Sequence, residues 1–245
     1  MPPDGTPDMQ ALIFDCDGVL VDTERDGHRV AFNQTFSELG LDHHWSVERY
    51  GELLLTAGGK ERMRRDFDET GWPETHPDRD ALIAQMHKLK TEIFMRLIGA
   101  GGLPLRPGVA RIIDEAIAEG ITLAVCSTSN EKAVQAVVDV LLGRARSDKI
   151  TVFAGDVVAA KKPAPDIYLL AAKTLGLDPA RCVVIEDSNN GLRAAKAAGM
   201  HCIVTVSSYT AGEDFALADK VVADLDKGQV GIATCRRLTE PSVPV

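Results

Sequence analysis

The chain has 245 residues, a formal net charge of −9 and a hydrophobic content of 45%. This composition supports a real hydrophobic core, and the length fits one large domain or two small ones. The acidic charge argues against binding to nucleic acid or to an anionic membrane, because either partner requires a dense basic face. No apolar run reaches the roughly 18 residues that a membrane-spanning helix needs.

The N-terminal segment combines an expected tail with one isolated strand. Residues 1–9, MPPDGTPDM, lack the basic and apolar regions of a secretory signal, so we expect a disordered tail. Residues 11–14 are an apolar run that is typical of a buried strand, which we expect at 10–14. A lone strand needs partners, so we expect it to join a sheet that later segments form.

Residues 22–103 contain no convincing buried strand. Their segments with amphipathic helical patterns are 23–40, 46–58, 60–71 and 78–99. This composition predicts a helical cap that is inserted after the first strand.

From residue 104 onward, strands and helices alternate. The expected strands are 121–127, 181–187, 201–206 and 220–224, and the expected helices are 107–120, 130–143, 165–176 and 189–199. Alternation with nearly continuous apolar strands predicts an α/β fold, a doubly wound parallel sheet covered by helices. We therefore expect an α/β core of residues 10–21 and 104–235, the cap at 22–103, and a C-terminal tail at 236–245.

Polar side chains stand where the expected strands end. Ligands of open α/β sheets bind beyond the carboxyl ends of the strands. The residues at these ends are Asp15 and Asp17, Ser127 and Thr128, and Glu186 and Asp187. Lys162 stands just before Pro163 at a helix entrance. Each pattern alone is typical of a turn or a helix cap, but all of them together, at one edge of a sheet, indicate a catalytic site.

The order of these motifs resembles that of the haloacid dehalogenase-like hydrolases. DCDGV (15–19) resembles the first motif of the family, Ser127 the second, Lys162 the third and EDS (186–188) the fourth. The resemblance covers 10–22 and 105–224, and it implies a Rossmann-like core. The inserted helices resemble the small α-helical cap of sugar-phosphate phosphatases and β-phosphoglucomutase. An aspartate in the position of Asp17 is typical of phosphatases and mutases, not of dehalogenases.

The residue types suit phosphoryl transfer. Asp15 and Asp17 repel each other, and both stay ionised only beside a compensating cation. Mg²⁺ is the hard, oxygen-liganded ion that is common at phosphate sites. We expect its ligands to be Asp15, Asp17, Glu186 (directly or through water) and Asp187. Asp15 would be the nucleophile, forming an aspartyl-phosphate, and Asp17 the general acid and base.

Two further segments would hold the phosphoryl group. Ser127 and the backbone N–H of Thr128 would bind phosphoryl oxygens at a helix N-terminus, which is a natural anion site. Lys162 would offset charge on the transferring group and keep Asp15 ionised.

The cap contains candidate substrate-binding residues. The GGKERMRR stretch presents Lys60 and Arg62, either to a second anionic group of the substrate or simply to solvent. Glu24 and His28 have i, i+4 spacing, so they share one helix face, over the active site or on the surface. Weaker candidates, which would also fit structural or solvent-facing positions, are Tyr50, His87, Lys90 and Arg106.

The cap segments also resemble one branch of the family, the CbbY-like phosphatases of photosynthetic organisms. The matching stretches are DTE (22–24), HRVAFNQTF (28–36), YGELL (50–54), GGKER (58–62), HKLKTEIF (87–94), LRPGV (105–109), KKPAPDIY (161–168) and EDSNNGLRAAKAAG (186–199). That branch dephosphorylates xylulose 1,5-bisphosphate, a misfire product that inhibits Rubisco.

The resemblance implies a Mg²⁺-dependent sugar bisphosphate phosphatase that protects Rubisco. The alternatives are a sugar-phosphate mutase of the β-phosphoglucomutase type and a broad small sugar-phosphate phosphatase. We expect a monomer. Plant-like members imply the chloroplast stroma, reached with a transit peptide that is absent from this sequence, and the alternative location is the cytoplasm.

Overall fold

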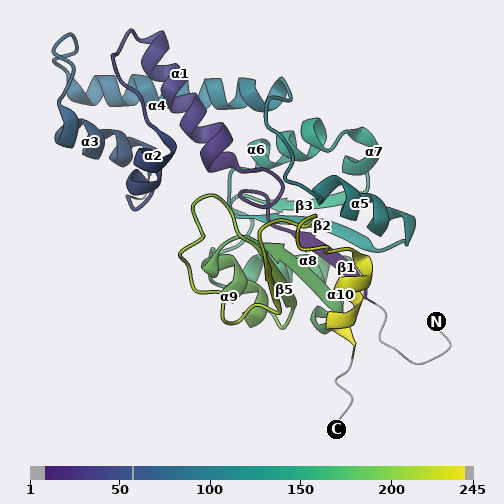
Figure 1. The fold of residues 1–245 in the computed structure, drawn as a ribbon. Helices are drawn as coiled ribbons and strands as arrows, with labels where there is room; N and C mark the ends of the chain where they lie inside the picture. Colours follow the sequence, from purple (N-terminus) through teal and green to yellow (C-terminus); the bar gives the residue numbers. More distant parts are fainter. Residues whose placement is uncertain (1–8, 57, 241–245) are drawn as a thin grey trace. The chain divides into compact units, whose positions relative to one another are not determined.

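The computed structural model describes residues 9–56 and 58–240. The chain divides into two compact units, Met1–Asp22 with Pro104–Val245, and Thr23–Leu103. The first unit contains a sheet with flanking helices, and the second is helical (Figure 1).

The first unit is built on a six-stranded parallel sheet with the order β3-β2-β1-β4-β5-β6. The strands are β1 (Ala11–Phe14), β2 (Thr122–Ser127), β3 (Ile150–Ala154), β4 (Cys182–Glu186), β5 (His201–Thr205) and β6 (Lys220–Val222). β1 lies at the centre, with Ala11 paired to Thr122 of β2 and to Cys182 of β4. The isolated first strand therefore joins the later strands, as expected, and its carboxyl end adjoins those of β2 and β4.

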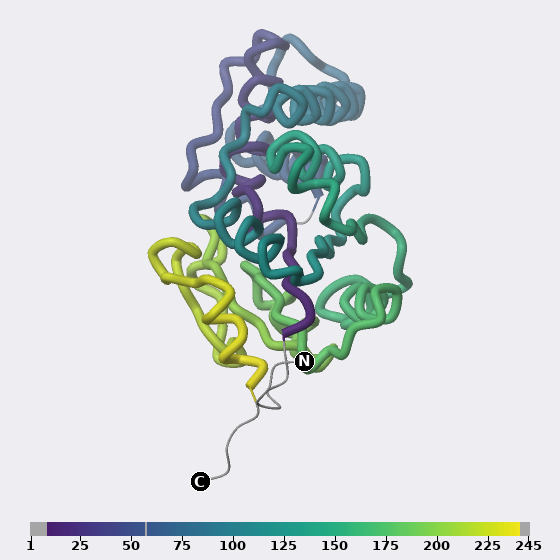
Figure 2. The backbone as a smooth tube through the Cα atoms, turned by 90° about the vertical axis from the view of Figure 1, so that its right-hand side faces the viewer, coloured from purple at the N-terminus to yellow at the C-terminus, as the bar shows by residue number. Residues whose placement is uncertain are grey.

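Helices cover both faces of this sheet, which explains why its central strands are apolar throughout. The helical segments of the unit are α5 (Val109–Ala118), α6 (Glu131–Ala136), the π-helical turn η2 (Val137–Leu141), α7 (Arg144–Ser147), α8 (Asp166–Leu175), the 3₁₀ turn η3 (Pro179–Arg181), α9 (Asn189–Ala197) and α10 (Ile232–Thr239). α5 and α10 contact each other and the sheet. Figure 2 shows the course of the chain from β1, in purple, to α10, in yellow.

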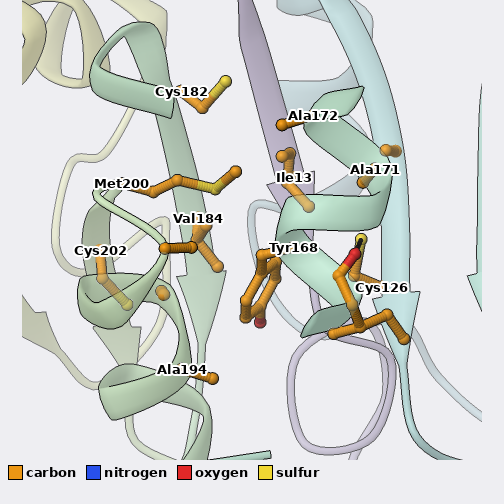
Figure 3. Close-up of a cluster of buried hydrophobic side chains, with 14 of the residues drawn as sticks. Ile13, Cys126, Tyr168, Ala171, Ala172, Cys182, Val184, Ala194, Met200 and Cys202 are labelled. Carbon is orange, nitrogen blue, oxygen red and sulfur yellow. Dashed lines mark hydrogen bonds between the residues drawn. The ribbon is translucent and has the colours of Figure 1, made fainter. Parts of the chain in front are cut away.

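On the other face, α8 and α9 close a buried cluster (Figure 3). Ile13 of β1 and Val184 of β4 pack there against Tyr168 and Ala171 of α8 and Ala194 of α9. This cluster fixes α8, and with it the residues just before α8, against the central strands.

Three details differ from the sequence-based expectations. β3 was not predicted: it lies at the edge of the sheet, where its first three residues are partly or fully exposed and only its last two are buried. The C-terminal boundary at residue 236 was wrong, because α10 continues to Thr239 and Arg236 pairs with Glu119 at 2.5 Å. Met9, which was assigned to the N-terminal tail, is 3% exposed. The remaining predicted tail residues, 1–8 and 241–245, lie outside the described residues.

The second unit consists of the π-helical turn η1 (Thr23–His28), α1 (Arg29–Glu38), α2 (Val47–Leu53), α3 (Gly59–Thr70) and α4 (Arg79–Gly99). Aromatic rings form its centre: Phe32 and Phe36 of α1 pack against Trp45, and Phe32 also packs against Tyr50. The unit thus has a core of its own.

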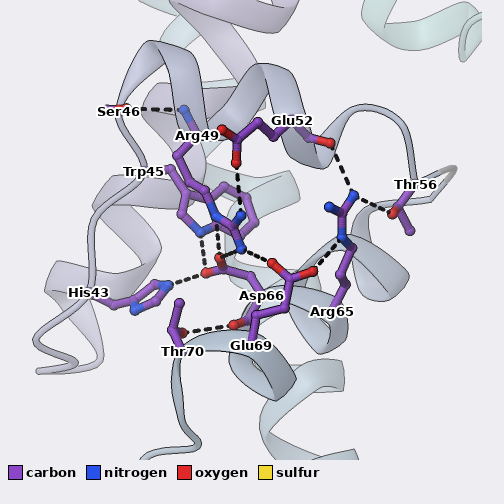
Figure 4. Close-up of polar contacts among 10 residues, drawn as sticks. All are labelled: His43, Trp45, Ser46, Arg49, Glu52, Thr56, Arg65, Asp66, Glu69 and Thr70. Atoms are coloured by element: carbon purple, nitrogen blue, oxygen red, sulfur yellow. Dashed lines mark hydrogen bonds and ion pairs between the residues drawn. The ribbon is translucent and has the colours of Figure 1, made fainter.

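One buried carboxylate links three segments of this unit (Figure 4). Asp66 accepts hydrogen bonds from Trp45 Nε1 at 2.5 Å, from Arg49 Nε at 2.8 Å and from the His43 ring. Burial raises the pKa of Asp66, but these hydrogen bonds outweigh it and lower the pKa to about 2. The network therefore stabilises the unit as long as Asp66 is ionised.

Candidate active site

Lys162 connects two of the motifs at the carboxyl edge of the sheet. Its Nζ donates to Asp15 Oδ1 at 2.6 Å, to Glu186 Oε1 at 2.6 Å and to the Cys126 carbonyl at 3.0 Å. The side chains of Lys162 and Asp15 are 8% and 11% exposed. Asp15 directly follows β1, and its N–H donates to the Ile185 carbonyl of β4 at 2.9 Å. Adjacent parallel strands thus bring Asp15 and Glu186 to one lysine.

Both oxygens of Glu186 have protein donors. Oε1 also accepts from the Tyr168 hydroxyl at 2.6 Å, and Oε2 accepts from the Asp187 N–H at 3.1 Å. A Cβ on Gly191 would lie 1.9 Å from Glu186 Cδ, so α9 approaches the carboxylate closely. The sequence analysis did not predict Tyr168 as a site residue. Its place in the first turn of the helix that follows the Lys162-Pro163 pair is a signal that could have identified it.

Negative charge at this edge exceeds the positive charge of Lys162. Carboxylate oxygens of Asp15, Glu186 and Asp187, all buried, lie within 4.8 Å of one another. Burial raises the pKa of Asp15 to about 7, with Lys162 opposing and the Glu186 and Asp17 carboxylates adding to the rise. Burial, followed by Glu186 and Asp15, also raises the pKa of Asp187 well above its ordinary value. Hard oxygen donors with uncompensated charge fit a divalent cation such as Mg²⁺.

Lys162 itself stays charged. Burial alone would lower the pKa of Lys162, but attraction to Asp15 and Glu186 outweighs burial and raises it. The lysine is therefore a fixed positive charge beside the candidate nucleophile.

The segment after β2 brings hydroxyl groups to the same edge. The Ser129 hydroxyl donates to Asp17 Oδ2, and the Ser129 N–H donates to Ser127 Oγ at 3.1 Å. The side chain that caps α6 is Asn130, which accepts from the Lys132 and Ala133 N–H groups. Ser127 therefore does not serve as the helix cap. Ser129 was not selected from the sequence, although it belongs to the same Ser-Thr-Ser run.

Thr128 borders a cavity of about 510 Å³ whose lining includes Asn130, Gly155 and Lys161. A cavity of this size accommodates a small ligand next to the candidate phosphate-binding residues.

Gly18 allows the first motif, residues 15–19, to pack closely against Asp187 of the fourth motif. Its φ is +80°, and a Cβ at this position would lie 2.0 Å from Asp187 Oδ2. Only glycine leaves room for this approach. The structure thus brings Asp15, Gly18 and Asp187 together.

Within the helical unit, three of the predicted cap residues form one cluster. The Tyr50 hydroxyl donates to Glu24 Oε2 at 2.6 Å, and Arg62 Nη1 donates to the Tyr50 hydroxyl at 3.1 Å. His28 belongs to a different contact, because its Nδ1 accepts from Lys90 Nζ at 3.0 Å. Lys60 is exposed.

Lys90, one of the weaker candidates from the sequence, is a partly buried cation. Burial lowers its pKa to about 8, with Glu24 opposing and Arg62 adding to the decrease. Burial and the charges of Lys90 and Arg62 also lower the pKa of His28. His28 is therefore neutral at pH 7, and the positive charges that act on it are those of Lys90 and Arg62.

In the part of the chain that the structure describes, no helix is both long and apolar enough to cross a membrane.

Comparison with known proteins identifies the family. The sequence model described as haloacid dehalogenase-like hydrolase matches residues 9–199. The chain belongs to the haloacid dehalogenase-like hydrolases.

Named relatives place it within this family. The chain is 58% identical over 235 residues to a CBBY-like protein of Arabidopsis thaliana, which covers 93% of this chain and 74% of the relative. It is 47% identical over 219 residues to protein CbbY of Rhodobacter capsulatus, covering 89% of this chain and 94% of the relative. These matches confirm the predicted CbbY-like branch.

Solved structures confirm the fold. CbbY from Rhodobacter sphaeroides in complex with phosphate superimposes with a TM-score of 0.73 at 44% identity, covering 93% of this chain and 99% of that chain. A mutant of the same protein in complex with xylulose-(1,5)bisphosphate gives the same values. The predicted doubly wound fold and the predicted enzyme class, a hydrolase of the sugar-phosphate phosphatase type, are thereby confirmed.

Proposed function

We propose that this enzyme is a Mg²⁺-dependent phosphatase of a small sugar bisphosphate, with xylulose 1,5-bisphosphate as the first candidate. The observation that carries the proposal is the buried cluster in which Asp15 and Glu186 share Lys162 and in which Asp187 lies beside them. The choice of sugar is supported by the CbbY structure that contains xylulose-(1,5)bisphosphate.

Asp15 is the proposed nucleophile. It attacks phosphorus with a carboxylate oxygen, the bond to the leaving alkoxide breaks, and an aspartyl-phosphate forms. Burial raises the pKa of Asp15, and the Lys162 charge, whose Nζ lies 2.6 Å from Asp15 Oδ1, acts to lower it. Lys162 therefore favours the ionised carboxylate that attacks phosphorus. Ser127 and the Thr128 N–H are proposed to bind phosphoryl oxygens, next to the Lys162 charge.

Asp17 is the proposed general acid and base. It gives its proton to the leaving alkoxide and then takes one from the water that hydrolyses the aspartyl-phosphate. The Ser129 hydroxyl donates to its Oδ2 and so orients the carboxyl group. A positioned group of this type contributes about 10²–10⁴-fold in rate.

The proposed metal ligands are Asp15, Asp17 and Asp187. Glu186 would act through water, because both of its oxygens already accept hydrogen bonds from the protein. When bound, Mg²⁺ neutralises phosphate charge and thus lets an anionic oxygen approach phosphorus.

The helical unit is proposed to recognise the rest of the substrate. Arg62, held by Tyr50, offers a cation for the second phosphate, and Glu24 in the same cluster accepts hydrogen bonds from sugar hydroxyls. Lys60 and His28 complete the proposed substrate-binding set. The proposed role is to dephosphorylate xylulose 1,5-bisphosphate, a misfire product that inhibits Rubisco, in the chloroplast stroma. The similarity to a plant protein supports this role.

The test is phosphate release from a panel of sugar mono- and bisphosphates, with and without Mg²⁺. We expect release from xylulose 1,5-bisphosphate only with Mg²⁺, and none from Asp15→Asn at an unchanged melting temperature. Normal release by Asp15→Asn would remove Asp15 from the role of nucleophile. Single-turnover products separate a phosphatase from a mutase, since the mutase yields an isomeric sugar phosphate instead of inorganic phosphate.

A further inference from the structure

The Arg106 side chain is half-buried, and its guanidinium binds four backbone carbonyl groups. The two terminal nitrogens of a guanidinium together carry four N–H donors. Nη1 donates to the carbonyl of Gly18 and to that of Thr205 at 2.9 Å. Nη2 donates to the carbonyls of Val206 at 2.7 Å and Ala223 at 2.8 Å. This arginine, one of the weaker candidates from the sequence, therefore has an acceptor within the protein for each terminal N–H.

The four carbonyls belong to segments that are far apart in the chain. Gly18 lies in the turn of the first motif, directly after Asp17, whereas the other three acceptors lie where β5 and β6 end. The Thr205 hydroxyl in turn donates to the carbonyl of Glu186, in the fourth motif, at 3.4 Å. Arg106 therefore connects the turn of the first motif with the strand ends beside the fourth.

Gly18 is the point of this turn that most needs an anchor. Because glycine has no Cβ, it reaches many backbone conformations and loses the most conformational entropy when it is fixed in one. Its conformation matters here, since a Cβ at Gly18 would lie 2.0 Å from Asp187 Oδ2. Within the turn, the Gly18 N–H donates to the Val21 carbonyl at 2.8 Å, and the Arg106 N–H donates to the Leu20 carbonyl at 2.9 Å. Backbone and side chain of Arg106 thus hold the same turn.

We propose that Arg106 is a positioning residue whose guanidinium holds the first-motif turn, and with it Asp15 and Asp17, at the correct distance from Asp187. The inference rests on the proposed function, in which these carboxylates carry the chemistry and bind the metal ion. A displacement of about 1 Å in a catalytic constellation can cost about 10²-fold in rate. Because Arg106 has its acceptors within the protein, its loss should lower kcat and leave KM nearly unchanged.

Arg111 provides a matched control, because its guanidinium also binds backbone carbonyls. Its Nη2 donates to the carbonyls of Leu225 at 3.3 Å and Val230 at 3.1 Å, and both residues lie outside the four motifs. Arg106→Lys and Arg111→Lys make the same replacement, in which the charge stays but one nitrogen takes the place of a planar fork. Of the two replacements, only Arg106→Lys removes the donor that the Gly18 carbonyl shares with the end of β5.

The experiment measures kcat and KM for a small aryl phosphate, and Mn²⁺ binding to the phosphate-free enzyme by electron paramagnetic resonance of the free ion. Arg106→Lys should lower kcat about 10²-fold at a nearly unchanged KM. It should also weaken Mn²⁺ binding about tenfold, the lower end of what the loss of a supporting partner costs a metal site. Arg111→Lys should match the unmodified enzyme in all three quantities. Arg106→Ala should change them in the same direction as Arg106→Lys, which keeps the charge and the aliphatic stem and so decides the test if the alanine variant does not fold.

The outcomes separate this inference from the function on which it rests. Normal kcat and Mn²⁺ affinity in Arg106→Lys, alongside lost turnover in Asp15→Asn and lost Mn²⁺ binding in Asp187→Asn, would overturn the positioning role and leave the proposed function standing. Normal turnover in Asp15→Asn would overturn the proposed function itself. Equal losses of kcat in Arg106→Lys and Arg111→Lys, with equally lowered melting temperatures, would mean a general loss of stability and would also overturn the inference.

Discussion

Replacement of Gly18 by alanine tests how closely the first and fourth motifs must approach. The added Cβ would lie 2.0 Å from Asp187 Oδ2 and 2.5 Å from Asp187 Cγ, so the carboxylate has to move by about 1 Å or more. A misplacement of about 1 Å in a catalytic constellation can cost about 10²-fold in rate. We expect Gly18→Ala to lower phosphate release by about that factor.

The φ of +80° at Gly18 adds backbone strain, which has to be separated from the clash. Gly143 supplies the control, because its φ is +76° and a Cβ added there would meet no atom within 4 Å. A left-handed alanine costs roughly 1 kcal/mol, which lowers the melting temperature by about 2–4 °C in a protein of this size. Both variants should show this decrease in melting temperature.

The assay is phosphate release from xylulose 1,5-bisphosphate and from a small aryl phosphate, together with a thermal melt of each variant. Gly143→Ala should retain full activity on both substrates. If Gly18→Ala turns over normally, or if Gly143→Ala loses as much activity, the close approach to Asp187 is not what the chemistry requires.

Three further predictions concern other parts of the molecule. Arg62→Ala should impair turnover of the bisphosphate more than that of an aryl phosphate, and equal losses would mean that Arg62 does not bind the distal phosphate. The pKa of Asp66 is about 2 in the folded chain, below its ordinary 3.8, so its stabilisation is complete above about pH 5 and is lost as the pH falls toward 2. The difference in free energy of unfolding between the unmodified protein and Asp66→Asn, measured by urea titration, should therefore fall by about 1 kcal/mol from about pH 5 to about pH 3. A difference that stays constant with pH would contradict this. Tyr168→Phe deletes the donor to Glu186 Oε1 and should reduce the free energy of unfolding by about 1.5–3 kcal/mol, whereas unchanged urea stability would show the hydrogen bond to be dispensable.

The strands and the motifs that end them could be predicted from the sequence. Apolar runs identify β1, β2, β4 and β5, and the parallel arrangement brings their carboxyl ends to one edge. Asp15, Lys162 and Asp187 could therefore be grouped although they are distant in the chain.

Contacts that depend on side-chain packing could not be predicted in this way. The donors to Asp66 come from His43, Trp45 and Arg49, whose convergence requires the helical unit to be assembled first. Ser207 stands in a polar segment where neither periodicity nor spacing distinguishes it from Ser208. Only the fold shows that the Ser207 hydroxyl pairs with the Thr210 hydroxyl, whereas the Ser208 hydroxyl donates to Asp22.

The central place of β1 has a consequence for biosynthesis. β1 is made first, but both of its neighbours, β2 and β4, are made only after the whole helical unit has been translated. The nascent chain must therefore hold an apolar segment without a partner on either side while the ribosome completes the helical unit. Until β4 emerges, one side of β1 offers unpaired backbone groups to other chains, so premature termination before residue 182 should yield an aggregating fragment.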